Sequence, residues 1–205
     1  MKGVLIMEQT MDSAIILLHE IYGKNRHILK IQQRLEHAGY QVVCPNLLNR
    51  EKPFDYEEQA EAYTSFIGQG GFSTAAKQVN SLVHSLRGKY RRVFIVGYSV
   101  GATIAWLLSR QQVPPDGIVG FYGSRIRDYP DIIPLCPALL VFPREEASFD
   151  VSGLVRILNG RTNLEIIQVH ALHGFADPWS AHYSEGGAEA AFGHMLRFIR
   201  SHGDV

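Results

Sequence analysis

Residues 92–101 read RVFIVGYSVG, and this stretch decides the fold. The continuous apolar run at 92–96 is typical of a buried central strand, and the pattern predicts a helix over about 100–111 directly after it. The GYSVG segment at 97–101 between them is the pattern of a nucleophile elbow. Its glycines let strand and helix pack closely, so that the hydroxyl of Ser99 projects at the helix N-terminus. We therefore predict that Ser99 is a nucleophile. The simpler alternative is an ordinary serine in a glycine-rich turn.

Strand and helix patterns alternate along the rest of the chain, which predicts an α/β fold with a mostly parallel sheet and helices on both faces. The 205 residues are expected to form a single domain. The glycine-rich region 46–72, which starts with a loop at 46–55, is either a lid or a simple surface connection. The other predicted strands are 3–7, 13–18, 40–44, 117–122, 138–142 and 164–169, and the other predicted helices are 27–38, 56–67, 73–87, 150–158 and 186–201.

Composition narrows the class of protein. Twenty basic and 20 acidic residues give a formal net charge of zero, which argues against a dedicated nucleic-acid binder. The two cysteines are too few for a disulfide framework and lack the spacing of a zinc site. The apolar run at the N-terminus is too short for a signal peptide, and no stretch is long enough to span a membrane. We expect a soluble, cytoplasmic protein without a membrane partner, and the oligomeric state stays open.

A nucleophilic serine needs a base, which is most often a histidine. His173 is the best placed, because it follows the last predicted strand and functional residues gather beyond the carboxyl ends of parallel strands. His170, at the strand end, is the rival and is expected to be a partly buried structural residue. His19 and His27 flank a loop that could line the site. The remaining candidates fall in or after helical patterns and are expected to be solvated: His37, His84, His194 and His202.

The acid that orients the base should follow the strand at 138–142. Three carboxylates compete there, and spacing from the strand end favours Glu146 over Glu145 and Asp150. Asp150 is also a natural helix N-cap. Asp177 follows His173 too closely for the expected chain order, although the sequence does not exclude a contact.

An oxyanion hole needs two backbone N–H groups, and those of Ile21 and Val100 are the candidates. Glu20 stands immediately beyond an apolar strand. It either lines the site, as Tyr22 and Tyr98 are also expected to do, or is an exposed salt-bridging residue. No metal ligands are expected.

Taken in order, these residues resemble the dienelactone hydrolase family of α/β-hydrolases. The likeness spans residues 14–199 and implies cleavage of ester or lactone bonds by a nucleophile–His–acid triad without a cofactor. It also implies that Glu20 matches the family's glutamate near the nucleophile, and that Ile21 and Val100 supply the oxyanion-hole amides. Four stretches carry it: LHEIYG at 18–23, GYSVG at 97–101, GFYG at 120–123 leading to CPALL at 136–140, and HGFA at 173–176.

Three features depart from that family. Its best-known members use cysteine where this chain has Ser99, so His173 must act as a base in each turnover. The family's Gly-x-x-Asp acid pattern is replaced by PREE at 143–146. Asp177 lies where an arginine of dienelactone hydrolase itself holds the substrate carboxylate, which argues against an anionic dienelactone as substrate.

The sequence therefore predicts a serine hydrolase of small esters or lactones that works through Ser99, His173 and Glu146. The alternative is a catalytically silent member of the same fold that binds a ligand. Thioester or peptide cleavage by the same residues is a third possibility, which the sequence does not separate from the first.

Overall fold

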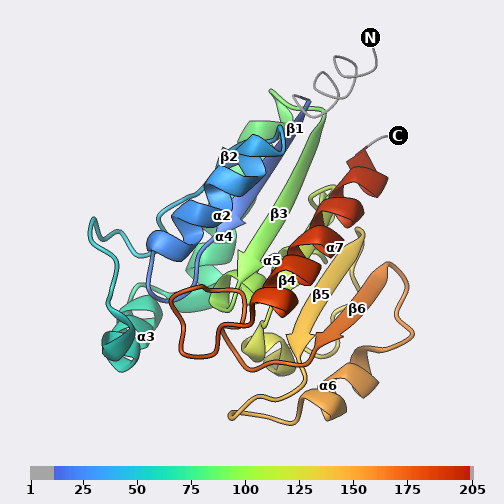
Figure 1. Ribbon diagram of the computed structural model, residues 1–205. Helices are drawn as coiled ribbons and strands as arrows, with labels where there is room; N and C mark the ends of the chain where they lie inside the picture. The colour runs from blue at the N-terminus through green and yellow to red at the C-terminus, as the bar shows by residue number, and fades with distance from the viewer. Residues whose placement is uncertain (1–11, 204–205) are drawn as a thin grey trace.

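A six-stranded sheet organises the computed structural model, which describes residues 12–203 (Figure 1). All neighbouring strands are parallel, in the order β2-β1-β3-β4-β5-β6. Six predicted strands are confirmed, and the predicted strand 3–7 lies outside the described residues. The strands are β1 (Ser13–Leu18), β2 (Gln41–Val43), β3 (Arg92–Tyr98), β4 (Gly117–Phe121), β5 (Ala138–Pro143) and β6 (Leu164–Val169).

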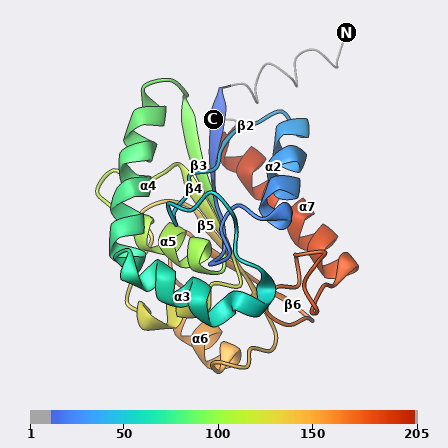
Figure 2. The same cartoon turned by 90° about the vertical axis from the view of Figure 1, so that its left-hand side faces the viewer.

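Helices cover both faces of the sheet, as the alternating pattern predicts (Figure 2). One face carries α2 (Arg26–His37) and α7 (Glu185–Gly203), whose apolar side chains share a core with β1, β3, β4 and β5. The other face carries α4 (Gly71–Arg87), α5 (Val100–Leu108) and α6 (Val151–Leu158). The remaining elements are the 3-10 turns η1 (Tyr56–Glu58) and η2 (Ser124–Asp128), and the helix α3 (Gln59–Gly68).

Most predicted helices have bounds within two residues of those in the structure, and two differ more. The helix predicted to reach residue 111 ends at Leu108, because the Ser109 hydroxyl donates to the Trp106 carbonyl and the Ser109 carbonyl accepts from the N–H of Leu135. The helix predicted over 56–67 opens as η1, where Glu58 accepts from the N–H of Asp55 in a capping box, and continues as α3.

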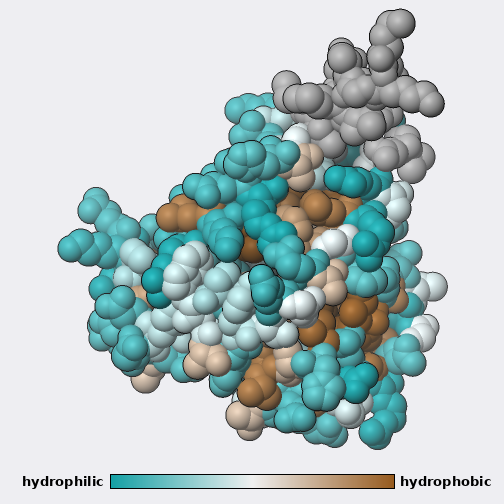
Figure 3. Space-filling model, viewed as in Figure 1, coloured by the Kyte–Doolittle hydropathy of each residue, from teal (hydrophilic) through white to brown (hydrophobic). Residues whose placement is uncertain are grey.

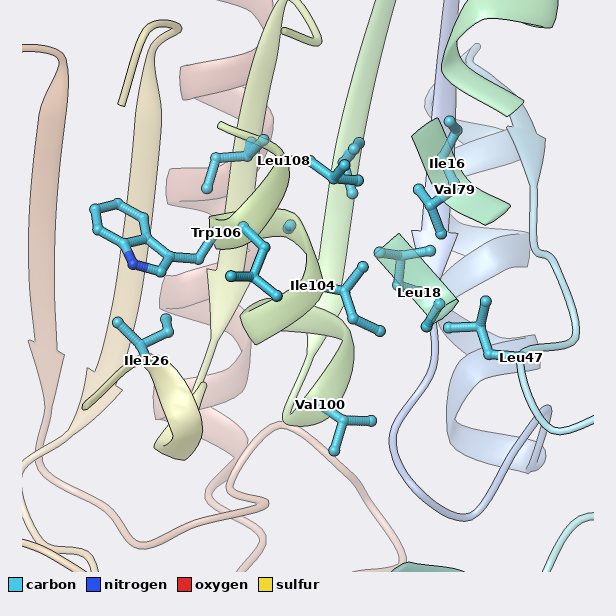
Figure 4. Close-up of a cluster of buried hydrophobic side chains, with 14 of the residues drawn as sticks. Ile16, Leu18, Leu47, Val79, Val100, Ile104, Trp106, Leu108 and Ile126 are labelled. Atoms are coloured by element: carbon cyan, nitrogen blue, oxygen red, sulfur yellow. The ribbon is translucent and has the colours of Figure 1, made fainter. Parts of the chain in front are cut away.

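The ends of β1 and β3 lie together at one edge of the sheet. Leu18 and Gly97 are paired in the register, so the segments that follow both strands emerge side by side. Figure 4 shows Leu18 and Val100, the first residue of α5, in the same apolar cluster. The buried core therefore fixes the elbow against the loop that follows β1.

Most of the surface in Figure 3 is hydrophilic, with apolar surface over β5 and β6 beside α7. This fits the half-buried pattern of β6, the edge strand of the sheet. Between residues 12 and 203, no helix combines the length and the apolar character needed to cross a membrane.

The two glycines of the elbow are required by close backbone contacts. A Cβ at Gly101 would lie 2.5 Å from the Leu18 carbonyl oxygen, and one at Gly97 would lie 2.2 Å from the carbonyl oxygen of Gly101. We expect Gly101→Ala to lower the free energy of unfolding by about 2–3 kcal/mol, because overpacking forces the backbone apart. Urea unfolding measures this.

Gly186 provides the control for that measurement. It lies in α7, and a Cβ there would meet nothing within 4 Å. Gly186→Ala should be neutral or stabilise by about 0.5–1 kcal/mol, since alanine is the better helix former. Equal effects of the two substitutions would contradict the close-contact argument.

Candidate active site

Ser99 occupies a strained turn between β3 and α5. Its backbone has φ 52° and ψ −110°, in a region that non-glycine residues rarely adopt. The N–H of Ser99 donates to the Phe121 carbonyl at 2.9 Å, which ties the turn to the end of β4. The structure therefore has the local strain expected of a nucleophile elbow.

His173 links Ser99 to a carboxylate. Its Nε2 lies 3.2 Å from the Ser99 hydroxyl oxygen, and its Nδ1 lies 2.6 Å from Oε1 of Glu146. Because a carboxylate only accepts hydrogen bonds, Nδ1 carries the proton and Nε2 is left as an acceptor for the serine hydroxyl. The Glu146 side chain is 4% exposed and that of His173 is 35% exposed, so the hydrogen bond between them is shielded while the imidazole stays accessible.

The other carboxylates near the end of β5 do not reach the imidazole. Glu145 is exposed. Asp150 stands at the N-cap position of α6 as predicted, but its side chain makes no capping hydrogen bond. Asp177, in the loop after His173, has other partners: its Oδ2 accepts from the Tyr56 hydroxyl at 2.5 Å and its Oδ1 from the N–H of Trp179 at 2.9 Å. Its charge is thus buried against these partners.

The remaining histidines differ from expectation in several places. His170 is exposed rather than partly buried, because it directly follows the edge strand β6. His194 and His202 are half-buried rather than solvated, because both lie on or near the side of α7 that packs on the sheet; His202 also rests against Phe198. His182, which the sequence analysis passed over, has Nδ1 3.0 Å from the His173 carbonyl oxygen and so steadies the loop that carries the imidazole.

His19 is a structural bridge between two loops. It is 1% exposed, with Nδ1 donating to the Glu20 carbonyl at 2.6 Å and Nε2 accepting from the N–H of Leu47 at 3.0 Å. Burial lowers the pKa of His19 to about 4, so the ring is neutral at physiological pH. It joins the loop after β1 to the loop after β2 and does not line the site.

The candidate oxyanion amides lie on the two segments that the elbow glycines bring together. Val100 is the first residue of α5, so its N–H points out of the helix N-terminus. Ile21 is buried, follows β1 by three residues and belongs to the same apolar cluster as Val100. The role of both amides in an oxyanion hole stays a prediction.

The predicted lining tyrosines take different positions. Tyr98 is 1% exposed and stacks on Phe121 with ring centroids 4.6 Å apart, so it supports the site from the core. Tyr22 is half-buried and meets the Tyr56 ring edge-on at 4.9 Å. Tyr56 also borders a cleft of about 460 Å³, which is lined by Asn25, Arg26 and residues 53–57.

Glu20 is buried, 4% exposed, and not an exposed salt-bridging residue. Burial by itself would raise its pKa, but the neighbouring His27 ring, with contributions from His173 and Tyr122, holds the pKa of Glu20 below its usual value. Sequence reasoning missed the roles of His27 and Tyr56 because no local motif links them to Glu20 or Asp177.

Neither cysteine is an activated thiol. Burial raises the pKa of Cys44 to about 11 and that of Cys136 to about 12, so both stay protonated near neutral pH. Within residues 12–203, neither thiol is hydrogen-bonded to Ser99 or His173, so the serine is the nucleophile candidate that the geometry favours.

Comparisons with known proteins give matches over most of the chain. A family model described as the dienelactone hydrolase family matches residues 1–203. The uncharacterized protein YczH of Bacillus subtilis (strain 168) is 42% identical over 189 residues, covering 91% of this chain and 90% of that protein. A carboxymethylenebutenolidase of Pseudomonas putida is 26% identical over 205 residues, covering 90% of this chain and 84% of that protein.

Solved structures share the fold. The dienelactone hydrolase-like promiscuous phosphotriesterase P91, from metagenomic libraries, superposes with a TM-score of 0.73 at 16% identity, covering 94% of this chain and 87% of that chain. Such a likeness speaks for the fold alone. Together with the parallel sheet and its helices on both faces, it confirms the predicted α/β-hydrolase fold.

Proposed function

The chain belongs to the dienelactone hydrolase family of carboxylic ester hydrolases, and on that basis we propose that it opens ester or lactone bonds of a small molecule through Ser99, His173 and Glu146. The observation that carries the proposal is the unbroken chain of contacts from the Ser99 hydroxyl through the His173 ring to the Glu146 carboxylate. These are the contacts that serine hydrolases need in order to generate a nucleophile at neutral pH.

In the first half of the proposed reaction, the Ser99 oxygen attacks the substrate carbonyl while Nε2 of His173 takes the hydroxyl proton. Glu146 stabilises the imidazolium that forms, and the N–H groups of Ile21 and Val100 stabilise the negative oxygen of the tetrahedral intermediate. His173 then gives its proton to the departing alcohol oxygen, the C–O bond breaks, and the acyl group stays on Ser99.

In the second half, water replaces the alcohol. His173 removes a proton from the water as it attacks the acyl carbonyl, and a second tetrahedral intermediate uses the same amides. Collapse of this intermediate breaks the bond to Ser99, which regains its proton from His173, and the carboxylic acid leaves. The ester or lactone and one water molecule are the reactants, and His173 carries each transferred proton.

Fluorophosphonate labelling followed by intact-mass measurement tests the proposed nucleophile. We expect one adduct on the wild-type protein and none on Ser99→Ala, since only an activated serine attacks phosphorus readily. Ser148→Ala is the matched control, because Ser148 is exposed in the loop that follows β5. A labelled Ser99→Ala protein, or an unlabelled wild type, would contradict the assignment.

A further inference from the structure

Three ionisable side chains form a buried cluster beside the proposed triad. Glu20, His27 and Asp177 are 4%, 0% and 1% exposed. Nδ1 of His27 lies 3.6 Å from Oε2 of Glu20 and 3.9 Å from Oδ2 of Asp177. One potential ligand atom from each residue lies within 4.8 Å of the other two. The cluster thus joins the loop after β1, the first turn of α2 and the loop between β6 and α7.

Two side chains at the cluster lack the hydrogen bonds that their burial demands. Among residues 12–203, both ring nitrogens of His27 are buried without a hydrogen-bond partner, and so is the hydroxyl of Tyr122. No lysine or arginine in that range forms an ion pair with Glu20 or Asp177. Two buried carboxylates beside an imidazole that makes no hydrogen bond are costly unless a positive charge compensates them. The arrangement therefore points to a ligand with positive charge.

We propose that Glu20, His27 and Asp177 bind one divalent transition-metal ion, for which Zn²⁺ is the first to test. Zinc bonds to imidazole nitrogen and carboxylate oxygen are about 2.0–2.2 Å long, which puts tetrahedral ligand atoms about 3.4 Å apart. The separations from His27 to the two carboxylates are within a few tenths of an ångström of that spacing. A divalent ion also balances the two carboxylates while the imidazole stays neutral.

The combination of one imidazole and two carboxylates indicates which class of metal ion the cluster would bind. Mg²⁺ and Ca²⁺ prefer oxygen ligands alone, whereas an imidazole nitrogen suits Zn²⁺ and its neighbours in the first transition row. With three protein ligands, such an ion keeps a position for water or another small ligand. We therefore expect the cluster to select Zn²⁺ over Mg²⁺.

Surrounding residues hold two of the ligands in place. The Tyr56 hydroxyl and the N–H of Trp179 donate to the two oxygens of Asp177, and Nδ2 of Asn25 donates to the Tyr56 oxygen at 3.3 Å. The Tyr98 ring meets the His27 ring edge-on, with centroids 4.9 Å apart. Such outer partners orient metal ligands and raise affinity.

Zinc binding to the untagged chain tests the proposal. After treatment with EDTA and dialysis, isothermal titration with ZnCl₂ should show about one equivalent bound, and mass spectrometry of the dialysed protein should recover it. Tm should rise by about 5–10 °C at a free Zn²⁺ concentration near 100 times Kd, and EDTA should reverse the rise. MgCl₂ should produce no comparable shift.

Matched variants locate the ion. His27→Gln should lose at least 10-fold in affinity, since a ligand is removed. His84→Gln, which removes an exposed histidine of α4, should bind as the wild type does. Asp177→Asn gives a second test if His27→Gln fails to fold. In the wild type, Co²⁺ should give visible d–d absorption that Zn²⁺ abolishes.

Three results would overturn the proposal. One is the absence of stoichiometric binding to the folded wild type. Another is binding that survives in both His27→Gln and Asp177→Asn. The third is loss of the ion in His173→Gln with retention in His27→Gln, which would place the ion at the triad. Fluorophosphonate labelling of Ser99 is independent of all three results.

Discussion

Ser99→Ala is expected to lower kcat/KM for p-nitrophenyl acetate by about 10⁴-fold or more, because it removes the proposed nucleophile. The substitution keeps the backbone intact: the N–H of residue 99 still donates to the Phe121 carbonyl, and alanine has no bulk beyond that of serine. Circular dichroism and the unfolding midpoint should match those of the wild type. Stopped-assay kinetics at saturating and subsaturating ester measure the loss.

A double variant tests whether Ser99 and His173 act together. Because the serine and the imidazole act as a unit, Ser99→Ala/His173→Ala should be no slower than Ser99→Ala alone. Ser148→Ala is again the control and should keep full activity. If the two losses multiplied instead, the 3.2 Å contact between His173 and Ser99 would not be the working one.

Glu146→Gln is expected to lower kcat by about 10²–10⁴-fold with little change in KM. The amide cannot stabilise the imidazolium, and it can hold the ring in the wrong tautomer. The 2.6 Å contact between Nδ1 of His173 and Oε1 of Glu146 is the physical basis for this expectation. Steady-state kinetics of the purified variant separate the two parameters.

The neighbouring carboxylates supply matched controls. Glu145→Gln removes the same charge one residue earlier, from an exposed side chain, and should change kcat by less than about 2-fold. Asp150→Asn, at the start of α6, should behave in the same way. A large loss in either control, with normal turnover in Glu146→Gln, would move the role of the acid to that residue.

Local sequence was enough to predict the secondary structure that positions the site. The apolar runs of β1, β3 and β5 are uninterrupted because parallel strands are buried on both faces. The helix patterns of α2 and α7 have the 3.6-residue period of one buried face. The predicted helix ends were wrong where tertiary contacts determine them. At Ser109, for example, the carbonyl accepts a hydrogen bond from the N–H of Leu135 and not from a further helical turn.

The sequence by itself determined the elbow and the order of the candidate triad. A glycine, a serine and a glycine at 97, 99 and 101 between a strand and a helix permit few backbone conformations. A Cβ at either glycine would collide with nearby backbone of the same chain. The position of His173 after the last strand follows from the rule that parallel strands end at one edge of a sheet.

Only the tertiary structure decided which carboxylate meets His173 and which side chains are buried with Glu20. Glu146 and His173 are 27 residues apart, and Ser99 and His173 are 74 apart, in segments without a periodic pattern. Loop conformation sets where such side chains point, and it depends on packing against other elements and not on local preference. His27 and Asp177 meet Glu20 for the same reason: the sheet brings together the ends of strands that are remote in sequence.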